Sequence, residues 1–525
     1  MAYNYSDRFK ATAVRDGKPN IAAGDPQQKR SPVFLPGDLH EEMCPYWDAI
    51  EAVRGGTQKL LEMGEAYLPK EPMEDDEAYS RRLNRAVLGF TPWYVRLVAG
   101  MTGTVFRKPV VMPEQVPVEV EPQFKDLTLK GDGIDAVSAE WFESGVDYNY
   151  AGMLIDYPDT EGLQTRRDER DRQVRPYWIL YPGSKILDIE YSQQGSVRKV
   201  SFVRLHQVVK ESVEGSEFEK ELIEQVLVYD LMATPDGTRC RYRIFRQDDD
   251  GEFVHKQGIT SLDEVPFVVF AVDKKNDMAI APPMTQIANL NLKHYQLSGD
   301  IDHALHIGAV PRLFIFGMSA NELGDLGSTS EAVCIPNPDA KVEWVVAPIT
   351  SYDALQSRIE KCELQMASLA LAAMHAQKNV GESADAKKLD RAQSDSILSQ
   401  MAIAFQTALN QALAIHCKYI GLEPVEVEIP RDFDATQITS DMVRALADVV
   451  NTGRLTTETF LRILHRGELG FPDGWTVEDE VKRLEAENKQ EAAPKQLPDP
   501  FGEEDIPDEA DPESEPEPDP ESVDQ

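Results

Sequence analysis

Two segments with helical spacing of apolar residues flank a short segment with strand-like alternation. In residues 284–306 apolar side chains recur every three or four positions, which predicts an amphipathic helix. In residues 348–374 they recur in near-heptad spacing and predict a second helix. The insert between the helices predicts strands at 312–316, 332–335 and 342–346. The apolar positions are Ile287, Leu290, Leu297, Ile301 and Leu305 in the first helix and Leu355, Ile359, Cys362, Met366, Leu369 and Ala373 in the second.

The chain before these helices predicts a helical opening followed by a β-rich lobe. We expect one helix from Pro45 to Met63, a second that begins with the acidic residues 75–77, and a third from Trp93 to Gly103. From Trp141 to Val272, alternation, β-branched residues and turn signals such as Pro235-Asp236-Gly237 predict short strands. The opening and the lobe together predict a mixed α+β region.

After the second amphipathic helix the chain again predicts mainly helices. Residues 375–385 form a polar loop that contains Gly381, and residues 386–420 predict a long helix. A short strand is expected at 425–429. Shorter helices are expected at 440–450, 456–464 and 477–487. The predicted fold class is therefore α+β, with several lobes.

Length and charge refine this picture. A chain of 525 residues exceeds what one hydrophobic core supports, since single cores stop growing near ~250–300 residues. The formal net charge is −37, and roughly a third of it lies in the Asp-, Glu- and Pro-rich residues 491–525, which we expect to be disordered. The remaining body is still acidic. Because proteins that wrap or read DNA need a basic surface, the charge disfavours tight DNA binding but permits an acidic wall past which DNA slides.

Cysteine usage and hydropathy point to a protein of the reducing cytosol. The five cysteines are scattered and none is in a CxxC spacing, so neither a disulfide framework nor a zinc site is indicated. The N-terminus lacks the apolar core of a signal peptide, and the longest apolar runs, 265–272 and 369–374, are far shorter than the ~20 residues of a membrane span. We therefore expect no membrane association.

The residues that could carry chemistry have competing interpretations. His294, His303 and His306 share one predicted helix, but nine residues are two and a half turns, so His294 and His303 face opposite sides and packing is favoured over a metal site. Asp156 and Asp159, with Glu161, could form a nuclease-like carboxylate group, although no basic cradle accompanies them.

No catalytic motif accompanies these residues. The sequence contains no GxSxG, HExxH or Walker pattern. We therefore expect neither an enzyme nor a bound metal or cofactor.

The clearest basic cluster lies in and after the polar loop. Lys378, Lys387 and Lys388 are either ordinary solvated lysines or contacts to DNA phosphates. The acidic tail is either a solubilising extension or a segment that docks a partner or lies at a channel mouth.

Several motifs, together with the order of elements, resemble the portal proteins of tailed bacteriophages, in particular a portal-like phage family long described as uncharacterised. The order in question is helix, small β insert, helix, polar loop, long helix and helical close. The motifs are Tyr67-Leu68-Pro69, Tyr79, Arg82, Arg85-Ala86, Gly100, Val105-Phe106-Arg107-Lys108-Pro109, Asp156-Tyr157-Pro158, Arg175-Pro176-Tyr177-Trp178, Leu290-Asn291-Leu292-Lys293-His294-Tyr295, Ala304-Leu305-His306, Pro311-Arg312-Leu313-Phe314 and Asn451 to Thr459.

The resemblance implies a division of the chain into named parts. These are an N-terminal arm (1–44), a wing (45–283), a first stem helix (284–307), a clip (308–347), a second stem helix (348–374), a tunnel loop (375–385), a long wing helix (386–424), a crown (425–490) and a disordered acidic tail (491–525). It also implies site residues. Gln377, Lys378, Asn379, Lys387 and Lys388 would face DNA, and Asn321, Glu322 and Asp325 of the clip would face partner proteins.

The implied function is a portal, a dodecameric ring at one capsid vertex of the virion, assembled in the host cytoplasm. The ring would pass double-stranded DNA without reading its sequence during packaging and ejection. Its partners would be the large terminase subunit, head-completion or adaptor and tail proteins, and capsid and scaffold proteins. Two alternatives stay open, a metal-dependent DNA-processing hydrolase built on the carboxylates of the β-rich lobe and another structural head-tail adaptor.

Overall fold

The computed structural model divides the chain into two compact units, one within Met1–Phe433 and one within Asp434–Gln525. The fold is mixed α+β, as the sequence predicts. The structure describes residues 14–15, 18–19, 31–113, 116–117, 120–158, 174–194, 197–213, 215–216, 218–235, 237–248, 251–272, 281–308, 312–316, 332–335, 342–345, 350–374, 384–431, 440–452, 456–466 and 480–484.

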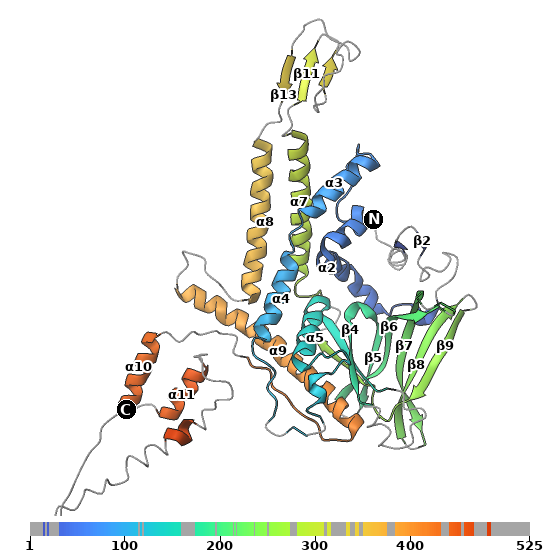
Figure 1. Ribbon diagram of the computed structural model, residues 1–525, viewed down its shortest axis with the longest axis vertical. Helices are drawn as coiled ribbons and strands as arrows, with labels where there is room; N and C mark the ends of the chain where they lie inside the picture. Colours follow the sequence, from blue (N-terminus) through green and yellow to red (C-terminus); the bar gives the residue numbers. More distant parts are fainter. Residues whose placement is uncertain are drawn as a thin grey trace, which may run out of the picture. The chain divides into compact units, whose positions relative to one another are not determined.

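The first unit opens with four helices (Figure 1). They are α2 (Asp38–Met63), α3 (Asp76–Leu88), α4 (Trp93–Val105) and α5 (Ile134–Tyr148), and short 3-10 helices lie at Pro32–Phe34, Gly64–Ala66, Gln123–Lys125 and Gly183–Lys185. The helix expected at Pro45 begins at Asp38 instead, so its first residues belong to the expected arm and Pro45 lies inside it. The acidic start of α3 is confirmed, since the Asp75 carboxylate accepts a hydrogen bond from the Ala78 amide (2.7 Å).

Helix α5 lies partly where we expected the β-rich lobe to begin. Its buried residues Ile134, Val137, Trp141 and Val146 recur every three to five positions, a helical period that the prediction missed. Gly145 explains part of the error, because glycine weakens a helical pattern. Here it is needed, since a Cβ atom at Gly145 would lie 2.3 Å from the Phe270 ring.

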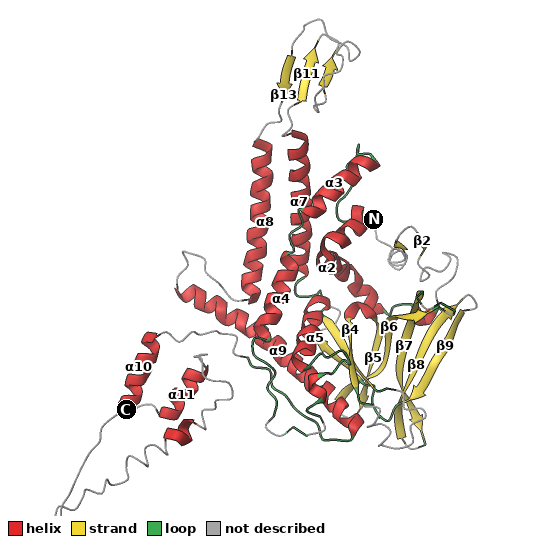
Figure 2. Ribbon diagram, viewed as in Figure 1, coloured by secondary structure: helices red, strands yellow, loops and turns green. Residues whose placement is uncertain are grey.

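Two antiparallel sheets follow (Figure 2). The expectation of short strands was wrong for the larger one, whose longest strand has 16 residues. The prediction found only the apolar centres of these strands, because their ends carry polar side chains that are largely exposed. The smaller sheet has the order β10-β3-β4, with β3 (Tyr150–Asp156), β4 (Tyr177–Pro182) and β10 (Phe267–Ala271). The larger has β5 (Ile186–Gln194), β6 (Val197–Ser212), β7 (Lys220–Thr234), β8 (Gly237–Asp248) and β9 (Gly251–Ile259) in sequence order.

Helix α9 (Ala384–Ile420) supplies the centre of the main core. Phe405 is fully buried, and its ring contacts those of Trp141 (5.3 Å between centroids), Phe142 (5.7 Å) and Phe270 (5.0 Å). The helix begins two residues before the predicted one, so the end of the expected tunnel loop is helical. Its aromatic contacts join α5 and β10, which are far apart in sequence, around one buried ring.

The two amphipathic segments form α7 (Thr285–Gly308) and α8 (Thr350–Met374). The insert between them contains the three predicted strands, β11 (Arg312–Phe316), β12 (Ala332–Ile335) and β13 (Val342–Val345). Strand β11 is central, parallel to β12 and antiparallel to β13. A further short hairpin is formed by β1 (Val14–Arg15) and β2 (Lys18–Pro19).

The second unit contains α10 (Ser440–Asn451) and α11 (Thr457–Arg466), close to two of the expected helices. The strand expected at 425–429 is absent from this described segment, where Glu428 forms an isolated bridge with Val111. Val425, Val427 and Ile429 are buried in the core of the first unit, so this stretch does not open a separate lobe.

Candidate functional site

The α7–α8 pair consists of the two segments that the sequence resemblance describes as stem helices. Its inner seam is apolar, and of the predicted stripe Ile359, Cys362 and Met366 of α8 are buried. Polar contacts also cross the seam. His294 Nε2 lies 3.1 Å from Glu363 Oε1, the Cys362 thiol lies 3.4 Å from the Leu290 carbonyl, and the Tyr352 hydroxyl donates to the Ala304 carbonyl (3.1 Å). These contacts hold the two helices together as a hairpin.

Helix α7 is held from a second side by residues 67–88, which we call the brace. Gln296 donates from its side-chain amide to the Tyr67 carbonyl (2.8 Å), and the Tyr79 hydroxyl donates to the Leu68 carbonyl (3.1 Å). The motif Tyr67-Leu68-Pro69 therefore meets α7 at the residue that directly follows the motif Leu290 to Tyr295, more than 200 residues away in the sequence.

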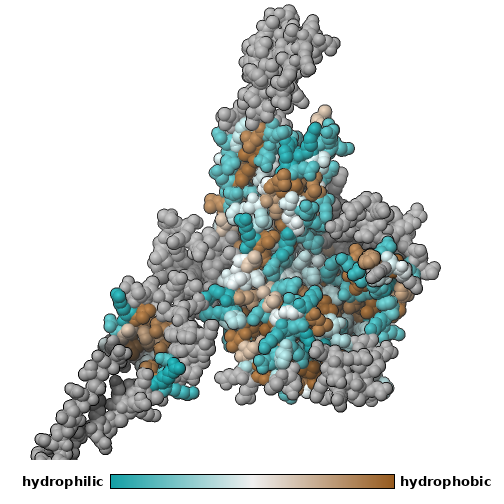
Figure 3. Space-filling view, viewed as in Figure 1, coloured by the Kyte–Doolittle hydropathy of each residue, from teal (hydrophilic) through white to brown (hydrophobic). Residues whose placement is uncertain are grey.

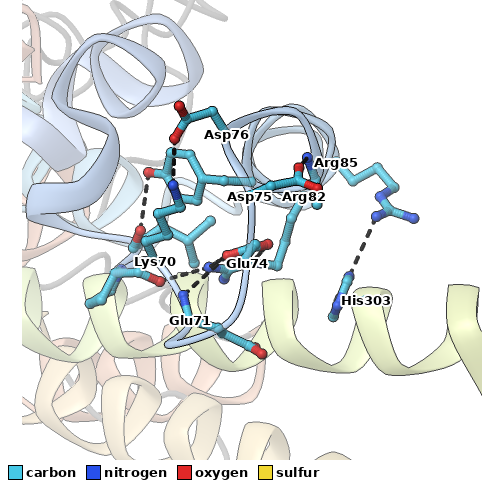
Figure 4. Close-up of polar contacts among 12 residues, drawn as sticks. Lys70, Glu71, Glu74, Asp75, Asp76, Arg82, Arg85 and His303 are labelled. Carbon is cyan, nitrogen blue, oxygen red and sulfur yellow. Dashed lines mark hydrogen bonds and ion pairs between the residues drawn. The ribbon is translucent and has the colours of Figure 1, made fainter.

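The brace is organised by a buried ion pair (Figure 4). Arg82, which is 2% exposed, donates to both carboxylate oxygens of Glu74 (2.9 and 2.8 Å) and to the Pro69 carbonyl (2.6 Å). This pairing lowers the pKa of Glu74 to about 2. On the facing helix, burial raises the pKa of Asp300, and Arg82 opposes the shift. Arg82 therefore fixes the turn before α3 and faces α7.

Asn291 connects α7 to a third helix. Its side chain is fully buried, accepts a hydrogen bond from the Tyr94 amide (3.0 Å) and donates to the Thr91 carbonyl (2.9 Å). Helix α4 starts after Pro92, which has no hydrogen-bonding side chain to cap it. The Trp93 amide donates to the nearby Thr91 carbonyl (2.9 Å), and the next amide, that of Tyr94, is the one that Asn291 receives. Asn291 provides the missing cap from 197 residues away. This role was not predicted, because its one sequence signal is an amide side chain between Leu290 and Leu292.

The histidines of α7 lie on separate sides, as their spacing predicts. His294 contacts Glu363 of α8, whereas His303 Nδ1 lies 3.4 Å from a guanidinium nitrogen of Arg85 on α3. Within the described ranges, no three His, Cys, Asp or Glu side chains gather in a way that could hold a metal ion.

The nuclease-like carboxylate group is not assembled in the described residues, since Asp159 and Glu161 lie outside them. Asp156 is surrounded by aromatic side chains. Its carboxylate accepts hydrogen bonds from the Tyr177 hydroxyl (2.8 Å) and the Tyr157 amide (2.9 Å). Burial raises its pKa. Asp156 is therefore a partly buried carboxylate held by hydrogen bonds from Tyr177 and from the Tyr157 amide.

The residues expected to face DNA or partner proteins are largely outside the described ranges. This applies to Gln377, Lys378 and Asn379 of the loop and to Asn321, Glu322 and Asp325 of the clip. Lys387 and Lys388 belong to the first turns of α9, and the structure does not describe their side chains.

A groove with a volume of about 680 Å³ follows the outer face of the hairpin. Figure 3 shows apolar side chains reaching the surface along the same hairpin. Leu364 is 66% exposed there. We call this feature the α7–α8 groove. It is lined by Gln286, Asn289, Leu290, Leu364, Gln365, Ser368 and Leu369.

Among the described helices, none is both long and apolar enough to cross a membrane.

A comparison with known protein families matches the segment that contains the α7–α8 hairpin. Residues 283–420 match the model of a family described as a domain of unknown function, DUF4055. The match begins just before α7 and ends with α9, so it contains the α7–α8 hairpin, the sheet of β11, β12 and β13 between its helices, and the long helix α9. No curated protein matches the chain.

Proposed function

We propose that the chain is the portal subunit of a tailed bacteriophage. About twelve copies would close into a ring that forms a channel for double-stranded DNA at one capsid vertex. The single observation that carries the proposal is the α7–α8 hairpin, with a small sheet between its helices in the sequence and α9 after it. This order is the stem, clip, stem and wing order of portals, and it coincides with the DUF4055 match.

The packing of the α7–α8 hairpin supports an assembly in which copies of the chain lie side by side. Each helix has 24 or 25 residues, yet α8 buries one narrow stripe against α7 and leaves Leu364 exposed. A helix with an apolar side chain on its open face is stabilised when a neighbour covers that face. Copies related by rotation about a channel axis would supply such a neighbour for every hairpin.

The charge supports passage of DNA without tight binding. The chain carries a net charge of −37, so a channel built from it would repel phosphate over most of its surface. DNA in such a channel would stay mobile, which packaging and ejection require. The terminase, adaptor and tail, and capsid and scaffold partners belong to this proposal, with a location in the virion.

Native mass spectrometry and negative-stain microscopy of the full chain test the proposal. We expect a closed ring of about twelve copies with a central hole, formed without DNA or metal. A protein that stays monomeric from low to high salt would reject it. Magnesium-dependent cleavage of DNA by such a monomer would support the hydrolase alternative.

A further inference from the structure

Met73 is the starting point, because it is an apolar residue that is 97% exposed on a fixed turn. The turn, residues 70–76, is closed by a hydrogen bond from the Glu74 amide to the Glu71 carbonyl (3.1 Å) and by one from the Glu71 amide to the Glu74 carboxylate (3.1 Å). That carboxylate is held in turn by Arg82. A side chain on so well fixed a support loses little conformational entropy when it binds a partner.

The α7–α8 groove offers an apolar surface with positive charge beside it. Leu290, Leu364 and Leu369 contribute its apolar area. Lys293 follows the lining residue Asn289 by four positions, and Lys361 precedes the lining residue Gln365 by four, so both lysines lie on the groove side of their helices. Both are exposed, as is Arg358 one turn before Lys361. By the same spacing the exposed Glu360 precedes the lining residue Leu364, so three cations and one carboxylate flank the groove, and the balance is positive.

The Met73 turn carries the opposite charge. Glu71, Asp75 and Asp76 are exposed on it, beside Lys70. In a chain with a net charge of −37, most surfaces would repel such a turn. The lysines and the arginine of the groove would attract it, and the groove leucines would receive the methionine side chain.

We propose that Met73 of one copy docks in the α7–α8 groove of the next copy. This rests on the proposed ring and deepens it, because it names the contacts between neighbours. The Met73 turn and the α7–α8 groove are different surfaces of one chain, so the contact between copies is heterologous, as a closed ring requires. The same cations could face DNA instead, but a leucine that is 66% exposed favours an apolar protein partner over phosphates.

Disulfide crosslinking of the full chain tests the contact. In Met73→Cys/Ser368→Cys, oxidation should link neighbouring copies into covalent dimers and larger multimers on a non-reducing gel. The matched control is Leu88→Cys/Ser368→Cys, because Leu88 is 80% exposed on the same brace but lies at the other end of α3. The control and each single variant should stay monomeric on the gel.

A second measurement uses substitutions that leave the fold intact, since both side chains are exposed. Met73→Ser should raise the protein concentration at which half of the rings dissociate by about tenfold, and Leu88→Ser should leave it unchanged.

The possible failures are distinct. If wild-type rings form but Met73→Cys/Ser368→Cys gives no covalent multimers, or if the control links equally well, the docking contact is wrong and the ring stands. If the wild-type chain forms no rings, the proposed function and this contact both fail. Protection of Lys293 and Lys361 from acetylation by DNA, but not by ring assembly, would assign the groove to DNA and reject the contact.

Discussion

A Cβ atom at Gly299 of α7 would lie 2.9 Å from the Cβ atom of Ala86 on α3. The two helices therefore meet over two of the smallest residues. Both Cβ atoms are attached directly to the backbone, so a clash between them cannot be relieved by rotating a side chain. This spacing sets how closely the brace approaches the hairpin. It also brings Gln296 within hydrogen-bonding distance of the Tyr67 carbonyl.

Substituting Gly299 tests this close approach. Alanine normally stabilises a helix interior relative to glycine by ~0.5–1 kcal/mol. At position 299 we expect the reverse, a loss of about 1–3 kcal/mol in the free energy of unfolding, because the added methyl group overpacks the junction. The matched control is Gly103→Ala in α4, where a Cβ atom would meet nothing within 4 Å and alanine should stabilise. Urea unfolding of both variants measures the difference, and equal stabilisation would contradict the close approach.

Arg82 should contribute far more to stability than its neighbour Arg81. Arg82→Ala leaves the largely buried Glu74 carboxylate without its partner and should lower the free energy of unfolding by about 3 kcal/mol. Arg81→Ala removes an exposed pair with Glu77 and should change it by less than ~0.5 kcal/mol. Thermal unfolding of both variants at neutral pH is the measurement.

The same pair has a characteristic pH dependence. The pKa of Glu74 is lowered to about 2 in the folded state, from an ordinary value of 4.5. Its stabilisation is therefore complete above pH 4.5 and is lost as the pH falls toward 2. The difference in stability between wild type and Arg82→Ala should shrink over that window. A difference that stays constant would show that Arg82 acts through packing alone.

Local patterns predicted the hairpin and the strands of its insert, because each depends on neighbouring residues. Near-heptad spacing placed Ile359, Cys362 and Met366 on the buried side of α8, where the structure has them. The stripe of α7 was less well predicted. Leu305 is 41% exposed, whereas His294 and Tyr295 are buried, because α3, α4 and α8 each cover a different side of this helix.

Contacts between distant segments could not be derived from the sequence. The Asn291 cap joins residues 197 positions apart, and the Arg82 pair depends on how a turn folds back on α3. Nor does an apolar run give the length of a strand whose ends are polar and largely exposed, as in β6 and β7. The α7–α8 groove likewise depends on how the two helices meet.

Replacing Asn291 tests the cap that α7 provides to α4. In Asn291→Leu the Tyr94 amide loses its acceptor in a buried environment, whereas the Thr91 carbonyl keeps the Trp93 amide as a donor, so we expect a loss of about 1–3 kcal/mol in the free energy of unfolding. Asn289→Leu, on the open side of the same helix, is the control and should change stability by less than ~0.5 kcal/mol. Hydrogen exchange of the Tyr94 amide gives a direct measurement. Protection that persists in Asn291→Leu would show that another group caps α4.

His416 should make the first unit sensitive to mild acid. The Trp178 indole donates to its Nδ1 (3.2 Å), so Nε2 carries the proton and donates to the Gln123 side chain (2.9 Å). Burial, together with the charge of Arg175, lowers the pKa of His416 from 6.5 to about 4. The unfolded chain therefore binds the proton more readily, and stability is lost as the pH falls from 6.5 to 4, by about 3 kcal/mol in total.

A variant that cannot titrate isolates this effect. The buried Asp147 acts in the opposite direction, because its pKa is raised from 3.8 to about 6 and stability falls as the pH rises through that window. We therefore expect the difference in unfolding free energy between wild type and His416→Gln to change by about 3 kcal/mol between pH 7 and pH 4, since the Asp147 contribution cancels. Urea unfolding across this range measures it. A constant difference would mean that the His416 ring binds a proton as readily in the folded chain as in the unfolded one. That result would contradict a neutral ring held between Trp178 and Gln123.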